Sequence, residues 1–107
     1  MQRYGRILKL RDGAEAEYDR LHAEVWPEVL EAIRQSDIRN YSIFRYRTWL
    51  FSYFELPDGT TLEQVGRGFE ANPACSRWER LMQTLQAPLP ESGAGAWWVP
   101  MNEVFHS

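Results

Sequence analysis

The order of apolar and polar residues predicts a β-strand near the start of the chain. Residues 3–10 follow an alternating pattern, and alternate side chains of a strand point to the same face. The segment 11–13, Arg-Asp-Gly, then ends the strand with residues that are typical of turns. One face of this strand would carry Tyr4, Arg6, Leu8 and Leu10.

From Ala14 the apolar residues are spaced by three or four, which is the period of a helix. This apolar stripe consists of Tyr18, Leu21, Val25, Val29 and Ile33. We expect the helix to end near residues 36–37. Pro27 lies inside the pattern and has no backbone N–H, so we expect a kink or a broken turn at residues 25–27. This break falls next to His22.

Two segments rich in aromatic and β-branched residues, 38–46 and 49–55, predict a β-hairpin. A short polar break, Arg47-Thr48, separates them, and the turn sequence Leu-Pro-Asp-Gly at 56–59 ends the second segment. The hairpin therefore follows directly after the predicted helix.

Two helix starts follow the hairpin. Thr60 and Glu63 resemble a capping box, which opens a helix whose apolar residues are Leu62, Val65 and Phe69. Asn72-Pro73 predicts a second start, with the asparagine as cap and the proline at the first helical position. The apolar stripe of this helix consists of Trp78, Leu81, Met82 and Leu85.

The end of the chain predicts a surface loop at 87–96 and a last strand at 97–105, with a bulge or an edge position at Pro100. The resulting order β-α-β-β-α-β defines an α+β fold of the ferredoxin-like type, with an antiparallel sheet. No repeat or linker divides the sequence, so we expect a single domain over residues 1–107. Helices on one face of the sheet would leave the other face bare, and a second copy of the chain is the simplest cover for it.

Composition excludes several classes of protein. The net charge of −3 comes from interspersed charges and carries no footprint for nucleic acid. Cys75 is the single cysteine, which excludes an intrachain disulfide and suits a reducing compartment. The polar start of the chain has no secretory signal pattern, and no stretch is long enough for a membrane span. We therefore expect a cytoplasmic protein that contacts neither membrane nor nucleic acid.

The candidate chemistry centres on His22, which lies four residues after Tyr18 and therefore on the same face of a helix. His22 could serve as a general acid or base, although a helix histidine satisfied by a neighbouring group is the commoner case. The other histidine, His106, lies next to the chain end and would fray. The spacing of the two histidines fits no metal site, and no phosphate loop, dinucleotide fingerprint or serine elbow is present.

Other candidate residues have an equally plain structural interpretation. Tyr18, Tyr41 and Trp78 could be core aromatic residues, or they could contact a ligand. Glu103 lies among apolar residues of the predicted last strand and would be either a solvent-facing carboxylate or a site residue on the sheet. Spacing alone does not select between these alternatives.

The sequence resembles the L-rhamnose mutarotase family over nearly its whole length. The landmarks occur in the family's order and at nearly its spacing: Tyr18-x-x-x-His22-x-x-x-Trp26-Pro27-Glu28, Asn40-Tyr41-x-Ile43, Cys75-x-Arg77-Trp78-x-x-x-Met82 and Glu103-Val104-Phe105. The resemblance implies a homodimeric α+β barrel that interconverts the α and β anomers of a 6-deoxy sugar without a cofactor. It also implies that His22 is the proton donor and that Tyr18, Tyr41 and Trp78 contact the monosaccharide.

The sequence departs from this family beside the proposed site. Glu79 stands where the rhamnose enzymes carry a second tryptophan, so a carboxylate replaces an indole among the expected sugar contacts, and Ala23-Glu24 replaces Asn-Pro after the histidine. Because this change alters the bonds available to hydroxyls, L-fucose competes with L-rhamnose as substrate. Two other functions remain as alternatives: a cofactor-independent monooxygenase of the dimeric barrel type, and a non-catalytic sugar-binding dimer.

Overall fold

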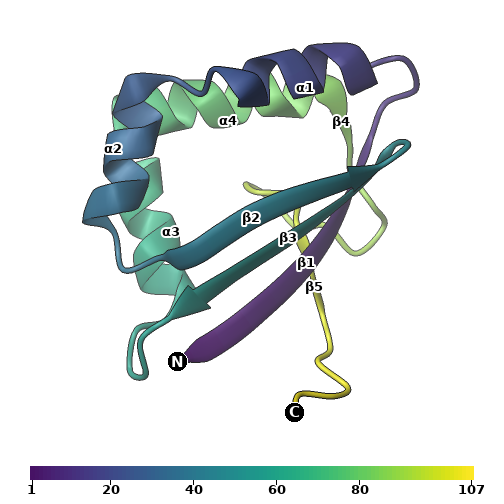
Figure 1. Cartoon of the computed structure of the whole chain (residues 1–107). Helices are drawn as coiled ribbons and strands as arrows, with labels where there is room; N and C mark the ends of the chain where they lie inside the picture. The colour runs from purple at the N-terminus through teal and green to yellow at the C-terminus, as the bar shows by residue number, and fades with distance from the viewer.

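A twisted antiparallel sheet forms one layer of the computed structural model, which describes residues 1–107, and the helices lie together on one side of it (Figure 1). The elements in chain order are β1 (Gln2–Leu10), α1 (Glu15–Ala23), α2 (Pro27–Gln35), β2 (Arg39–Tyr46), β3 (Trp49–Leu56), α3 (Leu62–Glu70), α4 (Pro73–Leu85), β4 (Gln86–Ala87) and β5 (Val99–Met101). This sequence of elements confirms the predicted α+β class.

Strand β1 occupies the centre of the sheet. Residues 2–9 of β1 pair with β3, and β3 pairs with β2 to give the order β2-β3-β1. On its other edge, β1 pairs with β5 at residues 5–7 and with β4 at residues 9–10. All of these pairings are antiparallel, as the ferredoxin-like arrangement requires.

The core lies between the helices and the sheet face that they cover, which we call the inner face. Along β3 the buried and partly exposed residues alternate strictly, as expected for a strand with one covered face. The fully buried side chains of this face are Leu8, Leu10, Leu50, Phe54 and Leu56. Tyr18 of α1 and Met82 of α4 pack against Leu8, Leu10 and Leu50, and this contact holds the two helices on the sheet.

Pro27 divides the predicted long helix into two helices. A proline disfavours helical geometry in the preceding residue, and Trp26 has φ −55° and ψ 134°, which is extended backbone. Helix α1 therefore ends at Ala23, and α2 begins at Pro27 in a new direction (Figure 1). Of the two predicted outcomes, a kink or a broken turn, the structure shows the broken turn.

The capping box of α3 lies one residue later than predicted. The Thr61 side chain accepts a hydrogen bond from the Gln64 backbone N–H at 3.1 Å, and the Gln64 side chain accepts one from the Thr61 backbone at 2.9 Å. Thr60 closes the preceding turn instead, because its N–H donates to the Pro57 carbonyl at 3.1 Å. The prediction of Thr60 and Glu63 as the capping pair was therefore wrong.

The last strand is much shorter than the predicted segment 97–105. Only Val99–Met101 pair with β1, and the following residues have no regular structure. Alternation alone could not show that the strand loses its partner after Met101. Residues 87–96 form a loop as predicted, except that Ala87 belongs to the two-residue strand β4.

The helices are short, and none combines the length and apolar character that crossing a membrane requires.

Replacement of Leu8 by alanine should lower the free energy of unfolding by about 2–5 kcal/mol, because Leu8 is fully buried and the change leaves a cavity in the core. Urea denaturation followed by circular dichroism measures this loss. Leu30→Ala provides the control, since Leu30 is 40% exposed on α2 and its loss should cost far less. Equal losses in the two variants would contradict this description of the core.

Candidate functional site

Tyr18, His22 and Trp78 meet where α1 passes along α4. The rings of Tyr18 and His22 stack with centroids 4.0 Å apart, as their spacing on one helical face predicts. The Trp78 ring meets His22 edge-on at 5.5 Å, and the Trp26 ring meets Trp78 edge-on at 5.1 Å. We call these four residues the aromatic wall. Trp26 joins it because the helix break at Pro27 turns the chain toward α4.

The His22 ring is held in one tautomer. Its Nδ1 lies 2.9 Å from the Tyr18 carbonyl oxygen, and because a carbonyl can only accept, Nδ1–H is the donor. Nε2 is then the atom that can exchange a proton with a ligand. Burial lowers the pKa of His22, and the Tyr18 carbonyl and the nearby Asp19 carboxylate partly oppose this shift.

An ion pair fixes α1 over β2. The Arg45 guanidinium donates to both carboxylate oxygens of Asp19, at 2.8 and 2.6 Å. This two-point contact has a defined geometry, and it holds the pKa of Asp19 below its usual range. Asp19 follows Tyr18 directly, so the ion pair joins α1 to β2 beside the aromatic wall.

Arg6 lies on the inner face of the sheet, opposite Ser52 on one side and Pro100 on the other. Its guanidinium carbon lies 4.8 Å from the Phe54 ring centroid and 5.4 Å from that of Trp98, which is a double cation–π contact. The Arg6 Nε is buried and makes no hydrogen bond. Burial lowers the pKa of Arg6, and the neighbouring Tyr41 and Glu79 oppose that shift.

Tyr41 lies within a bulge of β2, on the inner face of the sheet. The pairing with β3 shifts between Arg39 and Ser42, and Asn40 adopts the left-handed conformation with φ 52°. Asparagine tolerates this conformation better than most residues. The Tyr41 ring then meets Phe54 edge-on at 5.7 Å, and burial raises the pKa of its phenol.

Glu79 is half-buried on α4, beside Trp78 in the chain. Burial raises the pKa of its carboxyl, while the charge of Arg6 and a hydrogen bond from Gln83 oppose this shift. The Glu79 and Tyr41 side chains also help to raise the pKa of Tyr18, whose main cause is burial. The five residues singled out from the sequence thus gather in one region between the sheet and the helices α1 and α4.

Sequence analysis missed four members of this region: Arg6, Trp26, Phe54 and Trp98. The sequence could have indicated Arg6, because it is the charged residue on an otherwise apolar strand face. Of the two alternatives for Glu103, the structure shows the solvent-facing carboxylate: Glu103 is exposed and accepts a hydrogen bond from Arg3, with 3.0 Å between Arg3 Nε and Glu103 Oε1. His106 is also exposed, in a tail without regular structure.

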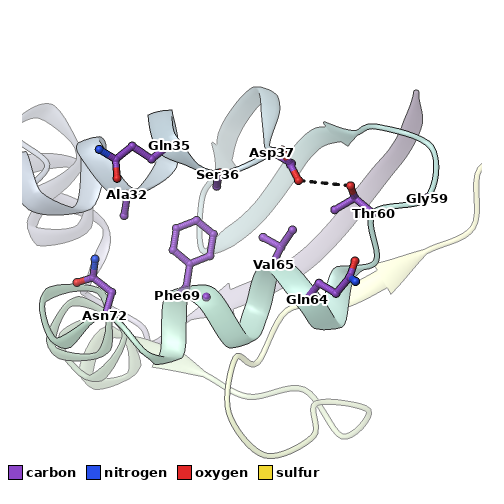
Figure 2. A pocket seen from close by; sticks show the side chains of 11 residues that line it. Ala32, Gln35, Ser36, Asp37, Gly59, Thr60, Gln64, Val65, Phe69 and Asn72 are labelled. Atoms are coloured by element: carbon purple, nitrogen blue, oxygen red, sulfur yellow. Dashed lines mark hydrogen bonds between the residues drawn. The ribbon is translucent and has the colours of Figure 1, made fainter.

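A separate hollow of about 640 Å³ opens between the end of α2, the β3–α3 turn and α3. Figure 2 shows its largely polar lining, including a hydrogen bond of 3.4 Å from Thr60 to Asp37. The hollow includes none of the predicted site residues. The structure also contains no group of three or more histidine, cysteine, aspartate or glutamate side chains that could hold a metal ion.

The fold and this region define a small α+β protein with a half-buried histidine in an aromatic wall. The family model for L-rhamnose mutarotase matches residues 3–107. The chain belongs to the L-rhamnose mutarotase family, a family of sugar isomerases whose name implies a monosaccharide substrate.

Named relatives include enzymes for two different sugars. The chain is 31% identical to an L-rhamnose mutarotase of Lactiplantibacillus plantarum, over 99% of this chain and 98% of that one. It is 32% identical to an L-fucose mutarotase of Xanthomonas campestris, over 98% of this chain and 87% of that one.

Solved structures show the same fold. The L-rhamnose mutarotase FA22100 of Formosa agariphila superposes with a TM-score of 0.77 at 21% identity, covering 100% of this chain and 99% of that one. The tetracenomycin F2 cyclase of Streptomyces glaucescens has a TM-score of 0.57 at 18% identity, covering 100% and 96%. These similarities support the fold alone.

His22 should titrate below its usual pKa of about 6.5, because burial disfavours the charged imidazolium. The unfolded chain then binds more protons than the folded chain between the two pKa values. The stability that His22 contributes is therefore complete above about pH 6.5 and decreases as the pH falls through its folded pKa.

NMR titration of the imidazole C–H signals measures this pKa, and His22→Gln assigns the signal. Chemical denaturation at several pH values measures the linked stability, which should depend less on acid in the variant. A His22 midpoint above 6.5 would contradict the described burial.

Proposed function

We propose that this chain interconverts the α and β anomers of a 6-deoxy hexose, L-rhamnose or L-fucose, by acid–base opening and closing of the sugar ring. One observation carries the proposal: the Tyr18 carbonyl holds His22 by Nδ1 within the aromatic wall and leaves Nε2 for proton exchange. Family membership supports the same reaction class. We further propose that residues 1–107 act as a single mutarotase-like domain and that the single, unpaired Cys75 suits a cytoplasmic location.

Mutarotation requires only proton transfers and rotation about one bond. A proton goes to the ring oxygen and another leaves the anomeric hydroxyl, so the C1–O5 bond breaks and a free aldehyde forms. Rotation about C1–C2 turns the other face of the aldehyde to O5, and the reverse transfers close the ring as the opposite anomer. Because the reaction also occurs in water, orientation and modest acid–base assistance suffice to accelerate it.

His22 is the proposed proton donor to the ring oxygen. Its lowered pKa makes the imidazolium a stronger acid, which favours transfer to a weakly basic oxygen, although it reduces the protonated fraction at neutral pH. The bond from Nδ1 to the Tyr18 carbonyl persists in both protonation states and keeps Nε2 in place. Tyr18, Tyr41 or a water molecule would then exchange the anomeric proton.

The aromatic and polar groups of the region fit the two kinds of surface on a deoxy sugar. Trp78 offers apolar ring surface to the C6 methyl group and the C–H faces, whereas the Tyr18 ring is buried and stacks on His22. Tyr41 and Glu79 offer groups that exchange hydrogen bonds with hydroxyls. Relatives named for L-rhamnose and for L-fucose are similarly close, at 31% and 32% identity, so both sugars belong in every assay.

The outer face of the sheet, opposite the helices, supports the proposal of a homodimer. Phe44 and Tyr46 are 65% and 63% exposed, and they lie opposite Phe51 and Trp49 on the neighbouring strand. These four residues form one aromatic patch, in which Phe44 and Tyr46 are exposed and Trp49 and Phe51 are partly exposed. A second copy of the chain would bury it and close the two sheets into a barrel.

The wild-type chain should accelerate exchange between the anomeric protons of L-rhamnose or L-fucose, as measured by saturation-transfer NMR on equilibrated sugar. His22→Ala should lower kcat by about 100-fold, because it removes the general acid. His106→Ala is the matched control and should leave the rate unchanged, since His106 is exposed in the tail. Exchange that is unaffected by His22→Ala would exclude His22 as the proton donor.

Phe44→Glu should convert the dimer to a monomer, because it places a charge within the aromatic patch. Light scattering after gel filtration should then give the chain mass of 12.6 kDa in place of twice that value. Leu30→Glu, an exposed apolar position on α2, should leave the wild-type mass unchanged. A wild-type chain with the mass of a monomer would contradict the proposed dimer.

A further inference from the structure

Arg6 is a partly buried cation that the proposed proton transfers do not use. Removing a guanidinium from water is costly unless its donors find partners, yet the Arg6 Nε is shielded from solvent and makes no hydrogen bond. The guanidinium carbon lies 4.8 Å from the Phe54 ring centroid and 5.4 Å from that of Trp98. These ring contacts leave Nε without a partner, while the neighbouring Tyr41 side chain interacts with the guanidinium and opposes the lowering of its pKa.

Glu79 is the acidic counterpart of Arg6 across the same region. Each side chain responds to the charge of the other, and each is penalised by burial. The two nevertheless form no direct ion pair, in contrast to Asp19 and Arg45, whose charged atoms lie 2.6 Å apart. If Arg6 and Glu79 served only to stabilise the fold, a direct ion pair between them would be more favourable than two separate charges.

A guanidinium and a carboxylate that lie in the same region without forming an ion pair match the chemistry of neighbouring sugar hydroxyls. Each hydroxyl can donate one hydrogen bond and accept others, so one hydroxyl can accept from the guanidinium while the next donates to the carboxylate. Such charge-assisted bonds are stronger than bonds between neutral groups. Their position also matters, because the charges of both residues affect the pKa of Tyr41, and the charge of Glu79 helps to raise the pKa of Tyr18.

We propose that Arg6 and Glu79 bind two adjacent hydroxyls of the sugar, Arg6 as donor and Glu79 as acceptor, and that this pair determines which 6-deoxy hexose the site prefers. The inference rests on the proposed mutarotase function and adds the residues that select the sugar. L-Rhamnose and L-fucose differ in configuration at C2 and C4, so their cis hydroxyl pairs lie at different places on the ring. One rigid donor and acceptor pair cannot satisfy both arrangements equally.

The variants Arg6→Lys and Glu79→Gln test this inference. Lysine keeps the charge and loses the fork, and glutamine keeps the size and loses the charge. For the preferred sugar, each variant should raise KM by about tenfold, the effect of losing one charge-assisted hydrogen bond, while kcat changes less than about threefold. The ratio of kcat/KM between L-rhamnose and L-fucose should move toward one.

Arg34→Lys is the matched control, because Arg34 pairs with Glu31 on the surface of α2, away from the proposed site. It should leave KM and sugar preference unchanged. Thermal unfolding shows whether each variant folds. If Arg6→Lys does not fold, the conservative variant Glu79→Gln still provides the test. Unchanged KM and unchanged preference in the folded variants, with or without a loss of stability, would overturn the inference.

A binding titration separates this inference from the proposed function. Ligand-observed NMR gives the Kd of each sugar for the wild type and for Glu79→Gln without any turnover. A wild-type chain that does not accelerate exchange overturns the proposed function, and the Kd values then decide the binding role of the pair. A tenfold weaker Kd in the variant supports that role, and equal Kd values refute it.

Discussion

The hydrogen bond between His22 Nδ1 and the Tyr18 carbonyl is the contact on which the proposed chemistry depends. It selects one tautomer of the ring and leaves Nε2 as the proton-exchanging atom. The same helical spacing stacks the Tyr18 ring against His22. One turn of α1 therefore provides both the carbonyl that holds His22 and two of the four residues of the aromatic wall. The break at Pro27 completes it by bringing Trp26 against Trp78.

The site lies where the apolar core gives way to polar groups on the same sheet face. Leu8 and Leu50 are fully buried. Arg6 lies two residues before Leu8 on the same face of β1, and its guanidinium contacts the Phe54 ring. Burial opposes the charged forms of Arg6, Glu79 and His22 alike. Such poorly solvated groups favour binding of a polar ligand, because the ligand provides the hydrogen bonds that water does not.

Local patterns predicted most of the fold, because apolar residues recur about every two residues in a half-covered strand and about every 3.6 residues in a helix. The same local reasoning placed Tyr18 and His22 on one face. It could not place Tyr41 or Trp78, which only the family resemblance linked to His22, because their proximity depends on how distant elements pack. It missed Trp98, which meets Arg6 across 92 residues of sequence (98 − 6). It also overextended the last strand, since pairing depends on a partner that no periodicity reveals.

The indole N–H signals of the tryptophans test most directly whether a 6-deoxy sugar binds between the sheet and the helices α1 and α4. Trp78 and Trp98 lie in that region, and Trp49 lies on the outer face and serves as an internal control. In a ¹⁵N spectrum titrated with L-rhamnose or L-fucose, the signals of Trp78 and Trp98 should shift while that of Trp49 stays in place. A shift of Trp49 with Trp78 and Trp98 unmoved would contradict the proposed site.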